Sequence, residues 1–308
     1  MLLPGHAPAR EVDDSYTIGQ RFAKYRDKFP GIAWPAVTWK AGQSVLFDRP
    51  YKNTGTRDLH IDVFRPSAGA NRQGILLVHG GGWRAGAKTH FYALANLLAQ
   101  RGYTVFLPEF RLSVEAAYPA GMIDIGDALA WTRAHAAEFD VDPSRIAVGG
   151  ASSGGQMASL LAYAGPSGLF GSGTERTAAA LIDLDGVLDF TTRRRCSSRM
   201  PPGGIARRAL ARRFLRARRR TLEGSERRQP CRRTVTADAD RQQRHPALHR
   251  RQGHGARLLE HHGIAHRFFA FENAPHDFWL FEPWLPRVAE QIDGFLKTLQ
   301  PTRGSAPE

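Results

Sequence analysis

A serine flanked by small residues is the feature of this 308-residue chain best suited to chemistry. Gly150-Ala151-Ser152-Ser153-Gly154 has the G-x-S-x-G spacing, which places a serine on a sharp turn between a strand and a helix. Ser152 holds the nucleophile position of this pattern. Ser153 is off the glycine register, and its backbone N–H is better placed to donate a hydrogen bond to an oxyanion. The alternative for an isolated match is a Gly/Ser turn without catalytic meaning.

A run of glycines upstream could stabilise the negative charge that attack by a serine creates. His79-Gly80-Gly81-Gly82-Trp83 directly follows the apolar stretch Gly74–Val78. Glycines at a strand end let backbone N–H groups point at a developing oxyanion. We expect Gly81, Gly82 and Ser153 to form this oxyanion hole. A flexible glycine turn is the alternative, but it would not explain the position of the run upstream of the serine motif.

A serine hydroxyl needs a base to become a nucleophile, and His276 has the right place in the chain. In the fold that carries the G-x-S-x-G turn, the order is nucleophile, acid, histidine. His276 follows the last strand-like stretch, whereas six others of the 12 histidines lie in or beside an arginine-rich segment. Those six are His245, His249, His254, His261, His262 and His266.

Alternating apolar runs and amphipathic stretches must position these residues. The predicted strands are Leu59–Phe64, Gly74–Val78, Tyr103–Pro108, Arg145–Val148, Ala178–Leu184 and His266–Phe271. The predicted helices are Phe91–Arg101, Gly121–Phe139, one that begins near Gly154, Ala256–His262 and Pro286–Leu299. This order predicts an α/β protein with a mostly parallel, doubly wound sheet.

The predicted domain organisation has three parts. Residues 1–40 form an N-terminal extension, residues 41–300 a single domain interrupted by residues 193–257, and residues 301–308 a tail. The interrupting segment carries a net charge of +17 within a chain of net charge +14, so the remainder has a net charge of −3. Because the excess charge is confined to one segment, we expect no nucleic-acid partner for the domain.

Several short motifs together resemble the α/β-hydrolase esterases related to hormone-sensitive lipase, and most closely the acetyl and feruloyl esterase group (BD-FAE-like). They are His79–Trp83, Tyr118-Pro119, Asp142-Pro143, Gly149–Gly155 and Pro275-His276. The likeness covers roughly residues 14–192 and 256–299. It implies the α/β-hydrolase fold and a carboxylic ester hydrolase that uses a serine acyl-enzyme. Short acyl esters of the acetyl type, on small molecules or carbohydrates, are the implied substrates.

Residues 193–257 should contain the next core strand of that group and its catalytic acid. Asp238 and Asp240 are weak candidates for the acid, because the preceding residues 230–234 are polar and basic rather than a buried strand. The sequence therefore predicts no strand in this segment and an acid that has been lost from it. A disordered basic insert is one interpretation. A shifted translation frame is the other, since moving residues 236–254 by one base permits Pro-Pro-Thr-Leu-Ile-Asp-Ser-Ser.

Other classes of function have weaker support. One alternative is a catalytically impaired hydrolase-fold protein whose basic insert binds polyanions, and another is a serine peptidase of the same fold. Asp183, Asp185 and Asp189 lack a nearby ligating histidine, so we expect structural hydrogen bonds and neither a metal nor a cofactor. No apolar run of about 18 residues predicts a membrane span. The chain as written is expected in the cytoplasm, or secreted or periplasmic if a signal peptide precedes Met1.

Overall fold

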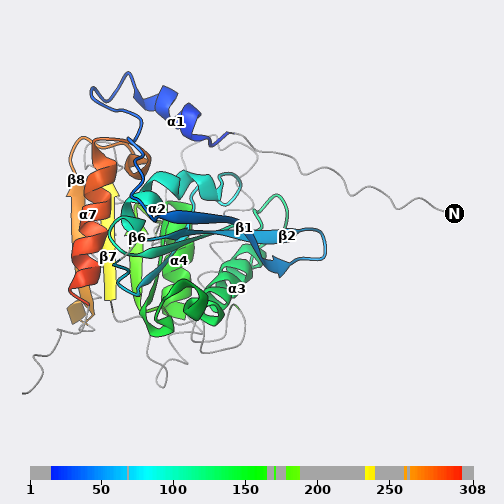
Figure 1. The fold of residues 1–308 in the computed structure, drawn as a ribbon. Coiled ribbons are helices and arrows are strands. Elements are labelled where there is room, and N and C mark those ends of the chain that lie inside the picture. Colours follow the sequence, from blue (N-terminus) through cyan, green and yellow to red (C-terminus); the bar gives the residue numbers. More distant parts are fainter. Residues whose placement is uncertain are drawn as a thin grey trace, which may run out of the picture.

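Eight strands form one sheet in the order β1-β2-β4-β3-β5-β6-β7-β8 (Figure 1). The structure, a computed structural model, describes residues 15–67, 69–164, 170, 178–187, 233–239, 260–261 and 264–299, and for 233–239 the backbone only. The strands are β1 (Ser44–Asn53), β2 (Asp58–Arg65), β3 (Gly74–Val78), β4 (Thr104–Pro108), β5 (Ile146–Ala151), β6 (Ala180–Leu184), β7 (Arg233–Ala239) and β8 (Ala265–Phe271).

The central strands are parallel, which confirms the predicted sheet type. Among the described strands, only β2 runs in the opposite direction, because it pairs antiparallel with both β1 and β4. In the parallel part, Val78 pairs with Gly150, and Ala151 pairs with Leu184. The carboxyl ends of β3, β5 and β6 therefore lie side by side at one edge of the sheet, where open α/β sheets bind their ligands.

Helices cover both faces of the sheet, so the predicted double winding is also confirmed. The α-helices are α1 (Ile18–Tyr25), α2 (Tyr92–Ala99), α3 (Ala120–Ala134), α4 (Ser153–Ala164) and α7 (Trp284–Lys297). The short 3-10 helices are η1 (Lys88–Phe91), η2 (Ala136–Phe139), η3 (Pro143–Arg145) and η7 (Phe278–Leu280). One buried cluster joins α2 and α7 to one face of the sheet, and a second joins α3 and α4 to the other.

Two strands and one α-helix of the described structure, β1, β7 and α1, were absent from the sequence prediction. The edge strand β1 contains Pro50 and has no fully buried side chain, so its apolar pattern is weak. Helix α1 has Ile18, Phe22 and Tyr25 at helical spacing, but it is only eight residues long and buries only Tyr25. The expectation of no strand in 193–257 was wrong, because β7 lies between β6 and β8 and pairs in parallel with both. Backbone pairing with two neighbours does not depend on the apolar side chains on which the prediction relied.

Parts of the predicted structure lie outside the described residues. Both interpretations of residues 193–257 lie outside the described residues, apart from the backbone of β7. The same holds for the predicted helix Ala256–His262, apart from Glu260 and His261. Where the chain is described, no helix has the length and apolar character needed to cross a bilayer.

Close packing of α4 on β3 gives a prediction about Gly154. A Cβ at this position would overlap the backbone oxygens of Val78 and His79. Alanine normally stabilises a helix relative to glycine by about 1 kcal/mol, but overpacking of this kind costs about 1–3 kcal/mol. Gly154→Ala is therefore expected to lower the free energy of unfolding, measured by urea denaturation.

Gly294 in α7 is the matched control for that substitution. A Cβ there would meet only the Arg267 guanidinium, at an ordinary 3.6 Å. Gly294→Ala should leave the protein equally stable or make it more stable. Equal effects of the two substitutions would contradict the described packing of α4.

Candidate active site

A strained turn presents Ser152 between β5 and α4. Ser152 has φ = 53°, in the left-handed region that residues other than glycine rarely adopt. Its backbone N–H donates to the Leu184 carbonyl at 3.0 Å, and its carbonyl accepts from the Gln156 N–H at 3.1 Å. A Cβ at Gly150 would lie 2.5 Å from the Gly154 carbonyl group, so glycine is needed where the strand passes the helix. These contacts fix the serine at the sheet edge.

A continuous chain of hydrogen-bonding groups connects Ser152, His276 and Asp185. The Nε2 atom of His276 lies 3.0 Å from Ser152 Oγ, and its Nδ1 atom lies 2.6 Å from Asp185 Oδ2. The carboxylate can only accept, so the Nδ1–H donates to Asp185 and Nε2 is left to accept the serine proton. The Asp185 side chain is 9% exposed and that of His276 is 42% exposed, so the base can be reached from solvent.

Each of the three side chains comes from the end of a different strand. Ser152 follows β5, Asp185 follows β6, and His276 lies in the loop between β8 and η7. Sequence reasoning brought Ser152 and His276 to one site, and the structure places them within hydrogen-bond distance. From the sequence, only structural hydrogen bonds were predicted for Asp185.

The carboxylate that contacts His276 could have been predicted from strand order. Asp185 directly follows the buried strand next to β5, and the pairing of Ala151 with Leu184 places it beside Ser152. An acidic residue at that strand end was the available signal. Of the two weaker candidates, Asp238 lies near the end of β7, where only the backbone is described, and Asp240 lies outside the described residues.

The glycine run folds back against the serine turn. Gly81 has φ = 122° and Gly82 has φ = 63°, conformations that suit glycine. A Cβ on Gly80 would lie 3.2 Å from the Cβ of Ser152. A glycine at position 80 therefore lets the glycine run approach the serine turn this closely. The Trp83 N–H donates to Ser153 Oγ at 3.3 Å.

Backbone N–H groups are available at this junction. Within the described residues, no hydrogen bond uses the N–H of Gly81 or Gly82. Ser153 begins α4, and the first N–H groups of a helix have no partner inside the helix. N–H donors beside a nucleophilic serine can stabilise the oxyanion of a tetrahedral intermediate.

A pocket lies between Trp83, the segment from Phe110 to Met122 and the first turn of α4. Its walls Trp83 and Gln156 are joined by a hydrogen bond of 3.1 Å from the indole Nε1 to the amide Oε1. The lining residues are Trp83, Phe110, Arg111, Ser113, Ala116, Tyr118, Gly121, Met122, Gln156 and Met157. Because most of these side chains are apolar, the pocket suits an apolar group bound beside the first turn of α4, the helix that follows Ser152.

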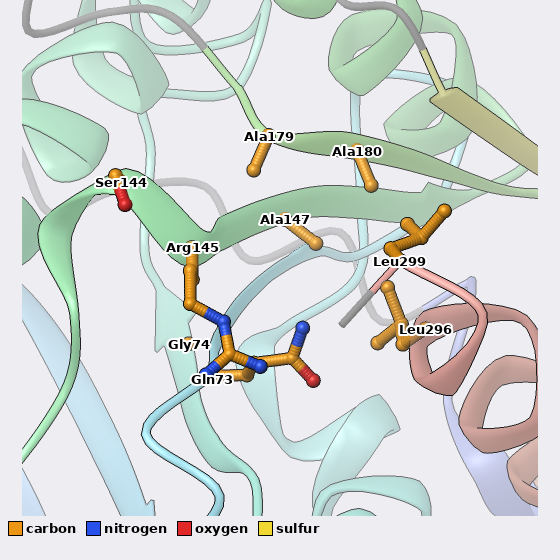
Figure 2. Close-up of a pocket in the computed structure, with 9 residues that line it drawn as sticks. All are labelled: Gln73, Gly74, Ser144, Arg145, Ala147, Ala179, Ala180, Leu296 and Leu299. Carbon is orange, nitrogen blue, oxygen red and sulfur yellow. The ribbon is translucent and has the colours of Figure 1, made fainter. Parts of the chain in front are cut away.

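A second pocket lies at the other end of the strands (Figure 2). Gly74 and Ala180 in its lining are the first residues of β3 and β6, and Arg145 immediately precedes β5. Ser152 follows the last residue of β5, so this pocket is at the opposite edge of the sheet. Among the described residues, no group of three or more His, Cys, Asp or Glu side chains could hold a metal ion.

The matched sequences are those of ester hydrolases. A family model described as BD-FAE matches residues 61–221, just over half of the chain. The "Probable carboxylic ester hydrolase LipM" of Mycobacterium tuberculosis is 33% identical over 139 residues, 43% of this chain and 32% of LipM. "Carboxylesterase NlhH" of the same species is 38% identical over 111 residues, 35% of this chain and 34% of NlhH. The chain thus spans about a third of the length of these curated relatives.

Solved esterase structures have the same fold. Esterase 2 of Thermogutta terrifontis, in a butyrate-bound form, superposes with a TM-score of 0.64 and 21% identity over 84% of this chain and 95% of its own. The form phosphorylated by paraoxon gives a TM-score of 0.64, 20% identity and the same coverage. At this identity the likeness establishes the fold.

The geometry predicts one unusually reactive serine. A fluorophosphonate probe should attach covalently to Ser152, because His276 can accept the hydroxyl proton while the nearby N–H groups bind the phosphonyl oxygen. Ser152→Ala should abolish the labelling seen by mass spectrometry, and the neighbouring Ser153→Ala should retain it. Labelling that survives Ser152→Ala would contradict the assignment of the nucleophile.

Proposed function

Since this chain belongs to the BD-FAE family, we propose that it is a carboxylic ester hydrolase in which Ser152 forms an acyl-enzyme. The observation that carries the proposal is the hydrogen-bonded series from Ser152 Oγ through His276 to Asp185, at 3.0 and 2.6 Å. The named activities of the curated relatives and the phosphorylated form of the Thermogutta esterase support the same chemistry.

Acylation begins with attack of Ser152 Oγ on the ester carbonyl carbon. The hydroxyl proton passes to His276 Nε2, and Asp185 stabilises the imidazolium that forms. The N–H groups of Gly81, Gly82 and Ser153 hold the carbonyl oxygen as it becomes negative. Collapse of the tetrahedral intermediate breaks the ester bond, and the alcohol leaves with the proton from His276.

Deacylation repeats these roles with water. His276 removes a proton from a water molecule as the water oxygen attacks the acyl carbon, and the same N–H groups hold the second oxyanion. The bond to Ser152 Oγ then breaks, the serine recovers its proton from His276, and the carboxylic acid leaves. No group other than these side chains and backbone donors is required.

We further propose short acyl esters, of the acetyl to butyryl type, as substrates. Trp83 and Gln156 line this pocket, Gln156 lies one helical turn after Ser152, and the hydrogen bond between the two side chains holds the indole in place. The butyrate- and propionate-bound forms of the Thermogutta esterase contain acids of this size. The alcohol part can be a small molecule or a carbohydrate, since the half-exposed His276 leaves the leaving-group side open.

The proposed acid gives a paired prediction. Asp185→Asn removes the charge that stabilises the imidazolium and permits the wrong histidine tautomer, a change that costs about 10⁴ in turnover in trypsin-type triads. We expect kcat for p-nitrophenyl acetate to fall by roughly 10²–10⁴. Asp238→Asn is the control and should leave kcat within about twofold. The reverse pattern would place the acid on β7.

Acyl length gives a second prediction. Esters of acetate and butyrate should be hydrolysed with at least a tenfold higher kcat/KM than the decanoate ester. Met157→Ala enlarges the pocket at a residue whose side chain is not in the reaction, so it should move the preference toward longer chains. An enzyme that prefers decanoate, or whose preference is unaltered by Met157→Ala, would show that this pocket does not bind the acyl group.

A further inference from the structure

A second buried carboxylate follows the histidine base directly. Asp277 is 0% exposed, and its two oxygens accept four hydrogen bonds or ion-pair contacts from the N-terminal part of the chain. Tyr16 Oη donates to Oδ1 at 2.5 Å, Tyr25 Oη donates to Oδ2 at 2.6 Å, and Arg21 contacts Oδ2 through Nε at 2.7 Å and a terminal nitrogen at 2.6 Å. None of these four residues lies within 61–221, the range matched by the family model.

We propose that Asp277 is a positioning residue, which holds His276 in line with Ser152 by anchoring the histidine loop to Tyr16, Arg21 and Tyr25. The inference rests on the proposed function, because it concerns the base of that reaction. It gives the N-terminal segment a part in catalysis without contact with the substrate. The cluster of these four side chains is called the Asp277 anchor below.

Adjacent residues in the loop point to different partners. The His276 ring reaches Ser152 and Asp185, while the Asp277 side chain reaches the N-terminal segment. The Asp277 carbonyl also accepts from the Leu280 N–H at 3.0 Å, which begins η7. A fixed Asp277 therefore fixes the backbone on one side of the His276 Cα, and small displacements of a general base are costly to catalysis.

The charge state of the Asp277 anchor is well defined. Burial tends to raise the pKa of Asp277, but the electrostatic influence of His276, the positive charge of Arg21 and the hydrogen bonds from the two tyrosines outweigh it and lower that pKa. Burial and the Asp277 charge raise the pKa of Tyr16 and of Tyr25, so both remain donors. Because removal of one partner leaves a buried charge uncompensated, the contacts resist displacement of the loop.

The N-terminal segment is itself secured to the segment after the histidine. Ala33 and Glu282 exchange two backbone hydrogen bonds of 3.1 Å each. The Phe29 ring packs edge-on against Trp284 at the start of α7, with centroids 5.9 Å apart. In Figure 1, α1 lies near the beginning of α7. These contacts hold Tyr16, Arg21 and Tyr25 in place and so keep the Asp277 anchor rigid.

Tyr16 also connects the Asp277 anchor to the glycine run. Its carbonyl accepts from His90 Nε2 at 3.0 Å, and its ring stacks on His90 at 5.0 Å. His90 in turn stacks on His79, the first residue of the glycine run, at 6.3 Å. One N-terminal tyrosine thus contacts the base loop and, through His90, the loop of the proposed oxyanion donors.

A buried ionic cluster can also act on stability alone, and the chain offers a matched control. Asp62 in β2 is likewise 0% exposed and is held by Lys88 at 2.7 Å and by the Tyr92 hydroxyl at 2.5 Å. It belongs to no part of the proposed active site. Asp62→Asn should therefore reproduce the loss of stability expected from Asp277→Asn without its effect on catalysis.

The experiment compares Asp277→Asn, Asp62→Asn and Ser152→Ala in the full chain with p-nitrophenyl acetate. Both aspartate variants should lower Tm, but only Asp277→Asn should lower kcat, by at least tenfold, with KM within about twofold. Equal kcat values in the two aspartate variants would overturn the proposal. Hydrolysis that survives Ser152→Ala would instead overturn the proposed function.

Two further measurements keep the test decisive. Tyr16→Phe removes one hydroxyl and replaces Asp277→Asn if that variant does not fold; its kcat should fall at least threefold. The His276 Nδ1–H proton, identified by its loss in His276→Ala, should shift or broaden in the NMR spectrum of the Asp277 or Tyr16 variant and stay unchanged in Asp62→Asn. An unchanged signal in all variants would overturn the positioning role independently of any esterase activity.

Discussion

The parallel alignment of β3, β5 and β6 is the constraint on which the candidate site depends. Pairing of Val78 with Gly150 and of Ala151 with Leu184 brings three strand ends to one edge of the sheet. The glycine run, Ser152 and Asp185 each begin where one of those strands ends. A one-residue change of register would send these groups to opposite faces of the sheet. Because burial of the apolar side chains fixes the register, it also fixes the relative positions of the site residues.

Local patterns in the sequence were sufficient where backbone geometry itself imposes the residue type. The left-handed turn at Ser152 and the close approach of Gly80 and Gly154 require small residues, and such requirements leave a visible motif. The buried strands β3, β4, β5 and β6 were predicted because continuous apolar runs follow from burial on both faces. His276 was predicted from the order of the chain, which the fold determines.

The remaining features depend on contacts between distant residues. Asp185 is 91 positions from His276, and only the placement of β6 beside β5 brings it near. The partners of Asp277 are more than 250 positions away in the chain. β7 is held by backbone pairing with β6 and β8. Its alternation of Val235, Ala237 and Ala239 with polar residues is short and only weakly apolar, and it lies within an arginine-rich segment. The position of Asp185 directly after a buried strand was a local signal, and the loop position of Asp277 gave none.

The central claim is that Ser152, made nucleophilic by His276 and Asp185, carries the acyl group during turnover. Rapid-quench mass spectrometry with p-nitrophenyl acetate tests it directly. The account predicts one acetyl group on the peptide that contains Ser152, formed as fast as the first equivalent of p-nitrophenol and absent from Ser152→Ala. Turnover without that adduct, or an acetyl group that accumulates on another residue at the same rate, would contradict it.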